Sequence, residues 1–457
     1  MDTTVAAIST AIGEAGIGIV RMTGPRSHDI AKMVFRNFKK EKIEKVKNRY
    51  LQYGFVYDDD LMLDEVLIAF MAGPRTYTRE DMVEIYCHGG TIAVKKVFNV
   101  LLKKGAMVAD RGEFTKRAFL NGRLDLSQAE SVIDLIHAKT DKSYEASLNQ
   151  LEGGLGSEVK ELKDMILDML ARVEYSINFM EDMQNELPVE PLLETGDEVL
   201  RRLDKMINSS NKGRILKEGI NTVIIGKPNV GKSSLLNALL KENRAIVTDV
   251  PGTTRDTIEE YLDLGGVSLK ITDTAGIRDT EDLVESIGVN KSIELIDGAD
   301  LIIAIFDVSR EFDEEDEKIM SLIRDRKSII LLNKNDLGAR ADRGQLEERF
   351  KDVKLIDMSI KNHKGVEELE ESIMDMFFDG EINITDDTII TNLRHKHIIE
   401  QAYESLKESI EDVRNGYPLD AIEIDLRNAY TLLGEITGET IEDDVLDKIF
   451  KDFCIGK

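Results

Sequence analysis

Cysteine is scarce in this sequence of 457 residues, which contains only Cys87 and Cys454. Two cysteines are too few for a disulfide framework, and they lack the paired spacing of a structural zinc site. We therefore expect neither a disulfide scaffold nor structural zinc, and the composition is typical of a protein of the reducing cytosol.

Long apolar runs are also missing. The longest, such as residues 301–306, are far too short to span a bilayer. The amino terminus carries an early Glu14 in place of the basic and apolar segments of a signal peptide. The sequence therefore predicts a cytoplasmic protein that has no membrane partner.

An excess of positive charge is lacking as well, since the formal net charge is −27. This excludes a protein that coats nucleic acid by bulk electrostatics, because such binding needs a dense face of Lys and Arg. Residues 1–118 nevertheless carry more basic than acidic side chains. They are the better candidate for contact with RNA or an anionic small molecule, although an ordinary mixed surface explains the same balance.

The length suggests roughly three domains. Residues 1–118 alternate short β-branched runs with one helical stretch, which is typical of a small α/β or α+β domain. Residues 216–378 alternate strand-like and helical runs, which predicts an inserted domain with a doubly wound, mainly parallel sheet. The flanking segments 119–215 and 379–457 show helical periodicity.

The two helical flanks contain long amphipathic patterns. Ser127 with Glu130 matches a capping box, and apolar residues at steps of three and four follow over 159–177 and again over 419–433. We interpret both flanks as parts of one central helical domain that is interrupted by the inserted domain. Two separate helical bundles are the alternative.

The segment GKPNVGKS at 226–233 fits the pattern of a phosphate-binding P-loop. An apolar run at 222–225 precedes it and a helical run at 235–240 follows it, which is the context such a loop needs. Its backbone N–H groups can surround phosphate oxygens, Lys232 can bridge the β- and γ-phosphates, and Ser233 can offer a hydroxyl to Mg²⁺.

Three further motifs follow in the order of a guanine-nucleotide site. DTAG at 273–276 places a carboxylate near Mg²⁺ and a glycine amide near the γ-phosphate. NKND at 333–336 ends in Asp336, which can accept hydrogen bonds from two guanine donors that adenine lacks. SIK at 359–361 would close over the base, so the set predicts a site for GTP in a Ras-like P-loop domain over residues 216–378.

The residue that usually orients the water for hydrolysis is missing from this sequence. Small Ras-like GTPases place a water-orienting glutamine directly after the glycine of the second motif, where this chain has Ile277. Another group must therefore orient the water. The acidic candidates just downstream, each of which taken alone is more often a surface charge, are Asp279, Glu281, Asp282 and Glu285.

The sequence GTTRD at 252–256, the insertion of the nucleotide domain between helices and the terminal FCIGK at 453–457 resemble the MnmE family, also called TrmE, of tRNA modification GTPases. The resemblance covers essentially the whole chain, including GEFT at 112–115 and FLNGRLDL at 119–126. It implies a heterotetramer with an FAD-containing MnmG-like protein that adds a carboxymethylaminomethyl-type group to C5 of the wobble uridine of certain tRNAs. It also implies a homodimer formed through residues 1–118.

The resemblance further implies hydrolysis that K⁺ activates. Ser233 and Thr254 match the Mg²⁺ ligands, and Glu285 matches the carboxylate that orients water. The residues that match the K⁺ site, where the cation would take the place of an arginine finger, are Asn229, Thr248, Val250 and Thr253. The complete predicted GTP site comprises Asn229, Val230, Gly231, Lys232, Ser233, Ser234, Thr248, Thr254, Asp273, Thr274, Ala275, Gly276, Asn333, Lys334, Asp336, Ser359, Ile360 and Lys361, with Lys232 and Glu285 as its catalytic residues.

A reduced folate, either 5-formyltetrahydrofolate or methylenetetrahydrofolate, is the further cofactor that the resemblance implies. Its site maps to Arg21, Glu84, Arg123 and Lys457. The three cations can hold the carboxylates of a glutamyl tail, and Glu84 can pair with the donor edge of a pterin. Taken alone, Arg21 and Glu84 are more often a surface ion pair.

The chain end should reach a pocket. We expect Ile449 and Phe453, four residues apart on a terminal helical pattern, to anchor the tail so that Gly456 lets Lys457 turn inward. Cys454 is expected to pack as a buried free thiol, with a part in the modification chemistry as the alternative.

A second class of function is a GTPase switch that regulates the assembly of ribosomes or other complexes, as in Era-like GTPases. Such a switch needs neither the CIGK sequence at 454–457 nor the amino-terminal domain. The sequence therefore favours the tRNA-modifying enzyme.

Overall fold

A computed structural model describes residues 2–178, 189–242, 260–271, 296–378, 389–441 and 443–457. They form two compact units, one comprising Met1–Ile136, Leu148–Val199 and Gln401–Lys457, the other His137–Ser147 and Leu200–Glu400. Within these described ranges no helix is long and apolar enough to cross a bilayer.

The amino-terminal domain is built on a sheet of order β3-β4-β5-β6-β2-β1-β7, in which only the β1–β7 pairing is parallel. Two helices pack on one face, where Ile30 and Leu101 join a buried core with Val20 and Ile68. The predicted strands and helix of this domain are confirmed. The elements are β1 Val5–Ile8, β2 Gly18–Thr23, α1 Ser27–Val34, β3 Phe35–Asn37, β4 Leu51–Asp58, β5 Leu61–Met71, β6 Met82–Cys87, α2 Thr91–Lys103 and β7 Met107–Val108.

Three helices of the first unit share a small core, although they come from distant parts of the chain. They are α3 Glu113–Leu120, α4 Leu126–His137 and α15 Asp443–Phe450. Leu126 of α4 is buried with Phe450 of α15 in this core. The core thus ties the end of the chain to the helices that follow the amino-terminal sheet.

The capping box predicted at Ser127 and Glu130 is wrong. The reciprocal pair forms two residues earlier, where Gln128 N donates to Asp125 Oδ1 at 2.8 Å and Asp125 N donates to Gln128 Oε1 at 3.0 Å. Asp125 therefore caps α4, and Ser127 lies inside the helix.

The long helices of the first unit come from both sides of the segment 216–378. The predicted apolar stripe of α6 is buried from Val159 to Val173, and α6 packs along α14. Gly196 of α7 lies so close to Ile410 of α13 that an added Cβ would come within 2.1 Å of Ile410 Cδ1. The helices that lie wholly in the first unit are α6 Gly154–Asn178 and α14 Leu419–Thr437, whereas the residues of α5 Asp141–Leu151, α7 Val189–Glu218 and α13 Leu393–Asn415 are divided between the two units.

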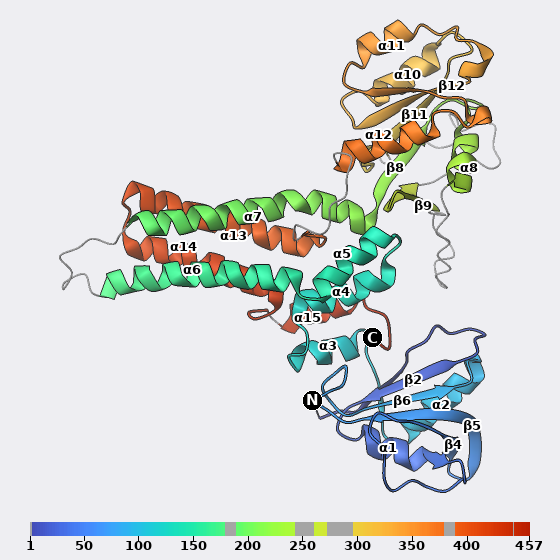
Figure 1. The fold of residues 1–457 in the computed structure, drawn as a ribbon, viewed down its shortest axis with the longest axis vertical. Helices are drawn as coiled ribbons and strands as arrows, with labels where there is room; N and C mark the ends of the chain where they lie inside the picture. Colours follow the sequence, from blue (N-terminus) through green and yellow to red (C-terminus); the bar gives the residue numbers. More distant parts are fainter. Residues whose placement is uncertain (1, 179–188, 243–259, 272–295, 379–388, 442) are drawn as a thin grey trace. The chain divides into compact units, whose positions relative to one another are not determined.

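The second unit contains a six-stranded sheet of order β13-β12-β11-β8-β10-β9 in which only β9 is antiparallel. Strand β11 is buried on both faces, because Ile303 packs into one core and Ile302 into the other. The prediction of a doubly wound, mainly parallel sheet is confirmed (Figure 1). The elements are β8 Ile220–Ile225, α8 Lys232–Glu242, β9 Glu260–Leu264, β10 Val267–Ile271, β11 Leu301–Asp307, α10 Glu314–Leu322, β12 Ser328–Asn333, η1 Asn335–Leu337, α11 Arg343–Arg349, β13 Lys354–Asp357, η2 Ile360–Asn362 and α12 Val366–Phe378.

Candidate functional site

The predicted P-loop joins the end of β8 to the start of α8. Gly226 and Gly231 have φ of 156° and 113°, and Asn229 has φ of 63°. A Cβ on Gly226 would approach Ile305 O to 2.6 Å, and one on Gly231 would approach Asn333 Nδ2 to 2.5 Å. Both glycines are therefore required by the tight turn and by the close approach of neighbouring strands.

Lys232 lies at the first position of α8 and turns back over its own loop. Its ammonium donates to Gly226 O at 2.5 Å and to Lys227 O at 2.7 Å. Burial lowers the pKa of Lys232, because a partly desolvated ammonium is less stable. A phosphate beside this ammonium would supply anionic oxygens in place of neutral carbonyl oxygens.

Asn333, at the end of β12, connects three of the predicted loops. Its Nδ2 donates to Val230 O in the P-loop at 2.7 Å, and its Oδ1 accepts from Ile360 N at 3.3 Å. Ser359 Oγ in turn donates to Asp336 Oδ1 at 2.8 Å. The structure thus brings the P-loop, the NKND segment and the SIK segment together at the carboxyl ends of parallel strands, where ligands of doubly wound sheets bind.

Lys334 follows Asn333 in a left-handed conformation, with φ of 64°. Its ammonium donates to Asp307 Oδ2 at 2.7 Å at the end of β11. Burial raises the pKa of Asp307, but hydrogen bonds from Lys334 and Ser309 outweigh it and the net pKa is lowered. The sequence prediction missed Asp307, although an aspartate that directly follows the apolar run 301–306 was a usable signal.

The prediction also missed the role of Lys227 in the P-loop. Its ammonium pairs with Asp313 and lies 3.2 Å from Glu315 Oε2. Asp313 caps α10 by accepting from the backbone N–H groups of Glu315 and Asp316. The hydrogen bond from Lys227 is the main reason that the pKa of Asp313 falls to about 2. This contact joins the P-loop to the start of α10.

The predicted folate residues Arg21 and Glu84 lie opposite each other on β2 and β6. Arg21 Nε and Nη2 each lie 2.9 Å from Glu84 Oε1, and Tyr86 OH donates to Glu84 Oε2 at 2.6 Å. Burial, followed by the hydrogen bond to Glu84, raises the pKa of Tyr86 to about 12. The Glu84 carboxylate is therefore held between a guanidinium and a phenol.

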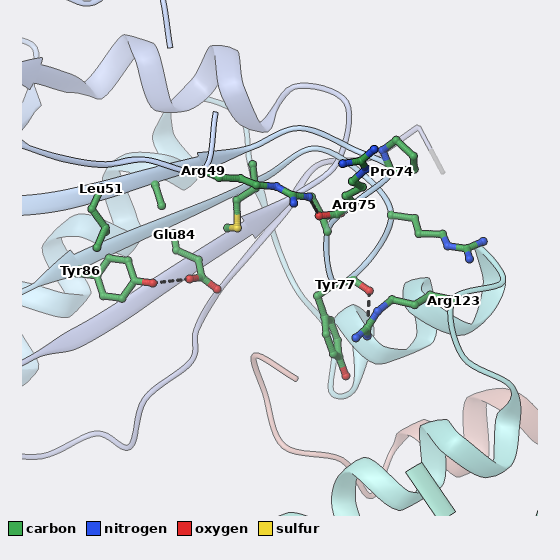
Figure 2. A pocket seen from close by; sticks show the side chains of 12 residues that line it. Arg49, Leu51, Pro74, Arg75, Tyr77, Glu84, Tyr86 and Arg123 are labelled. Atoms are coloured by element: carbon green, nitrogen blue, oxygen red, sulfur yellow. Dashed lines mark hydrogen bonds between the residues drawn. The ribbon is translucent and has the colours of Figure 1, made fainter. Parts of the chain in front are cut away.

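Glu84 and Arg123 line the same cavity, which has a volume of about 670 Å³ (Figure 2). The Arg123 guanidinium lies 4.6 Å from the centre of the Tyr77 ring and donates to Tyr77 O at 3.5 Å. The complete lining is Arg49, Leu51, Ala69, Met71, Pro74, Arg75, Thr76, Tyr77, Arg79, Glu84, Tyr86 and Arg123.

The chain end lies against the amino-terminal domain. Arg21 Nη1 donates to Gly456 O at 3.3 Å, and Phe114 N donates to Lys457 O at 3.2 Å. Gly456 has φ of 88°, and a Cβ there would approach Ile8 O to 2.7 Å. Gly456 therefore makes the left-handed turn that was expected, and this turn places its carbonyl oxygen beside the Arg21 guanidinium.

Two details of the tail differ from the prediction. Helix α15 ends at Phe450, so Phe453 anchors the tail from beyond the helix, with its ring centre 4.9 Å from that of Phe450. Cys454 is exposed, so the prediction of a buried thiol is wrong. The helical period does not continue past Phe450, and the buried position is that of Phe453.

Three further predicted residues are described and exposed, namely Ser233 and Ser234 at the start of α8 and Lys361 in η2. Several other predicted positions lie outside the described residues. The predicted residues outside the described ranges are Thr248, Val250, Thr253, Thr254, Asp273, Thr274, Ala275, Gly276 and Glu285, together with the alternatives Asp279, Glu281 and Asp282.

Comparisons with known proteins cover the whole chain. Among solved structures, the G domain of the T. maritima FeoB iron transporter matches 34% of this chain and 96% of its own, with 25% identity and a TM-score of 0.26. A family model described as GTP-binding protein TrmE N-terminus matches residues 4–123, and one described as the MnmE helical domain matches residues 126–454. The chain is 61% identical to the tRNA modification GTPase MnmE of Finegoldia magna, 50% identical to that of Alkaliphilus metalliredigens and 47% identical to that of Clostridioides difficile, each over 100% of both chains. With full-length relatives at this level of identity, the chain belongs to the MnmE family of tRNA modification GTPases.

Proposed function

We propose that this chain hydrolyses GTP and, with an FAD-containing MnmG-like partner, adds a carboxymethylaminomethyl-type group to C5 of the wobble uridine of certain tRNAs. The observation that best supports the GTPase activity is that the three nucleotide loops meet at Asn333. The names of the full-length relatives support tRNA as the substrate and disfavour the Era-like assembly switch. The free cysteines Cys87 and Cys454 support a cytoplasmic location.

In this proposal GTP and Mg²⁺ bind at the P-loop. Lys232 exchanges its two carbonyl partners for phosphate oxygens, and the exposed hydroxyl of Ser233 at the start of α8 is available to the metal. K⁺ would bind beside Asn229. The backbone of this residue has a left-handed conformation, which a short polar side chain tolerates. The cation supplies positive charge near the phosphates, where other GTPases use an arginine.

Reconstitution tests the proposal as a whole. The full-length protein, the MnmG-like partner, unmodified tRNA, GTP and a reduced folate are combined, and nucleosides are analysed by mass spectrometry. We expect the modified uridine only with GTP, and GTP hydrolysis several-fold faster in K⁺ than in Na⁺. An unmodified wobble uridine with an active partner would refute the enzymatic proposal, and equal turnover in both salts would refute the K⁺ site.

Guanine selectivity should depend on Asp336. Ser359 Oγ donates to Oδ1 of this exposed carboxylate, and lone pairs of both carboxylate oxygens remain available to guanine. Asp336→Asn should reduce the preference for GTP over ATP at least tenfold, because an amide offers one oxygen where the carboxylate offers two. Competition binding with labelled GTP measures the preference. Asp352→Asn, on an exposed loop before β13, is the matched control, and an unchanged preference in Asp336→Asn would contradict the assignment.

We further propose that a reduced folate binds at Arg21, Glu84, Arg123 and Lys457. The side chains of Arg21 and Glu84 are only 20% and 16% exposed, so their pairing is part of the folded domain and not a loose surface contact. Glu84 also lines the cavity that Arg123 borders. A carboxylate and a guanidinium in one cavity suit a ligand that has a donor-rich ring and an anionic tail.

A homodimer through the amino-terminal domain is supported by the sheet face opposite α1 and α2. Leu51, Tyr53 and Leu67 on adjoining strands are 54%, 47% and 40% exposed. Leu67 also pairs with Tyr86, so this apolar face continues to the cavity. In the described part of the chain no helix covers these side chains, as expected for a surface that a second copy buries.

Contact with tRNA is supported by a basic segment between β3 and β4. Its five exposed lysines have no carboxylate within ion-pair distance among the described residues, and Phe38 beside them is 62% exposed. Three of the ammonium groups lie over aromatic rings, those of Lys39, Lys40 and Lys47, and exposed ammonium groups without a carboxylate partner beside such rings suit the phosphates and bases of RNA. The lysines are Lys39, Lys40, Lys42, Lys45 and Lys47.

A further inference from the structure

The cavity beside Glu84 carries more positive charge than the proposed folate site requires. Arginines line it at four positions, of which only Arg123 belongs to the predicted folate set. Glu84 is its only carboxylate, and Arg21 already pairs with that group. The other three guanidiniums are those of Arg49, Arg75 and Arg79.

Within the described parts of the chain, none of these three guanidiniums has a carboxylate partner. Arg49 donates to the main-chain oxygen of Arg75, and Arg79 Nη1 donates to Asn121 O at 2.9 Å. Figure 2 shows Arg49 and Arg75 close together at one side of the cavity, and Arg123 with Tyr77 at another. Guanidiniums that find only carbonyl partners keep several N–H donors available to an anion.

The backbone holds two of these arginines in a disfavoured conformation. Arg49 and Arg79 both have φ of 60°, in the left-handed region that long side chains rarely adopt. The loop that carries Arg75 and Arg79 is tied down, because Thr76 Oγ1 donates to Glu80 O at 2.6 Å and Gly73 N donates to Asp81 Oδ1 at 2.9 Å. Ordered backbone therefore presents these guanidiniums to the cavity.

We propose that Arg49, Arg75 and Arg79 bind the additional carboxylates of an oligo-γ-glutamyl tail, so that the cavity selects polyglutamylated reduced folate over the monoglutamyl form. This inference rests on the proposed folate site. With the first glutamyl carboxylates at Arg123, each further γ-glutamyl unit adds one carboxylate along the same cavity. The planar fork of a guanidinium matches a carboxylate in bidentate geometry.

The test compares two ligands on the full-length protein by titration calorimetry. We expect the penta-γ-glutamyl form of 5-formyltetrahydrofolate to bind at least tenfold more tightly than the monoglutamyl form. The double variant Arg75→Gln with Arg79→Gln should reduce that ratio to near one. The affinity for the monoglutamyl form serves as the internal reference. Arg26→Gln, an exposed arginine that does not line the cavity, is the matched control.

The outcomes separate this inference from the folate proposal. Equal affinity of the wild type for both ligands would overturn the inference and leave the folate site standing. Failure of both ligands to bind would overturn the folate site itself. If the double variant keeps the preference but loses affinity for a tRNA fragment, the arginines serve RNA and the inference is wrong. Loss of the preference with unchanged tRNA affinity supports it.

Discussion

A chain that ends at Phe453 is expected to lose reduced-folate binding and tRNA modification while it keeps GTP hydrolysis. The deleted residues contribute Gly456, which accepts from Arg21, and Lys457, which accepts from Phe114. The Lys457 ammonium would also be lost, and a charge-assisted hydrogen bond contributes about 1.5–3 kcal/mol. All described tail contacts lie in the first unit, whereas the nucleotide loops lie in the second.

Point variants show whether the tail acts through its main-chain contacts or through the Cys454 thiol. Gly456→Ala should weaken folate binding as well, because the added Cβ would meet Ile8 O at 2.7 Å and displace the tail. Cys454→Ser keeps the main-chain contacts, so folate binding should persist, and loss of modification in this variant alone would assign chemistry to the exposed thiol. Titration with 5-formyltetrahydrofolate measures binding. Full affinity in the truncated chain would remove the tail from the site.

Replacement of Arg117 should destabilise the amino-terminal domain more than any exposed charge change. Arg117 is 1% exposed, and its guanidinium lies 3.0 Å from Glu80 Oε2 and 2.8 Å from Glu113 Oε1. It also donates to Thr3 O at 2.8 Å. Arg117→Met keeps most of the apolar stem but leaves two largely buried carboxylates unpaired, which costs about 3–5 kcal/mol.

Amide hydrogen exchange detects this loss without assuming that the whole chain unfolds in one step. At β1 amides that exchange through opening of the domain, the rate should rise roughly 100- to 4,000-fold, because every 1.4 kcal/mol is a factor of ten. Lys116→Met is the adjacent control, because Lys116 pairs with Asp447, which is 56% exposed, and such pairs contribute about 0–1 kcal/mol. Similar exchange rates in the two variants would mean that the buried network is not a stabilising element.

The nucleotide domain was predictable because its signals are local. Buried parallel strands appear in the sequence as continuous apolar runs. Strands β11 and β12 are examples, since all their residues are buried. The two glycines of the P-loop motif stand at positions where the backbone has a positive φ, which glycine adopts readily. Two overlapping signals caused the error at α4: Asp125 with Gln128 and Ser127 with Glu130 both fit a capping box, and only the backbone path selects one.

By itself, the sequence determined the family, the element types and the order of the nucleotide motifs, because periodicity and motif spacing act between residues close along the chain. Only the tertiary structure decided which distant groups meet. Gly456 packs on Ile8, Lys334 finds Asp307, and three unassigned arginines share a cavity with Glu84. Such contacts depend on how sheets and loops are arranged in three dimensions, and no local pattern encodes them.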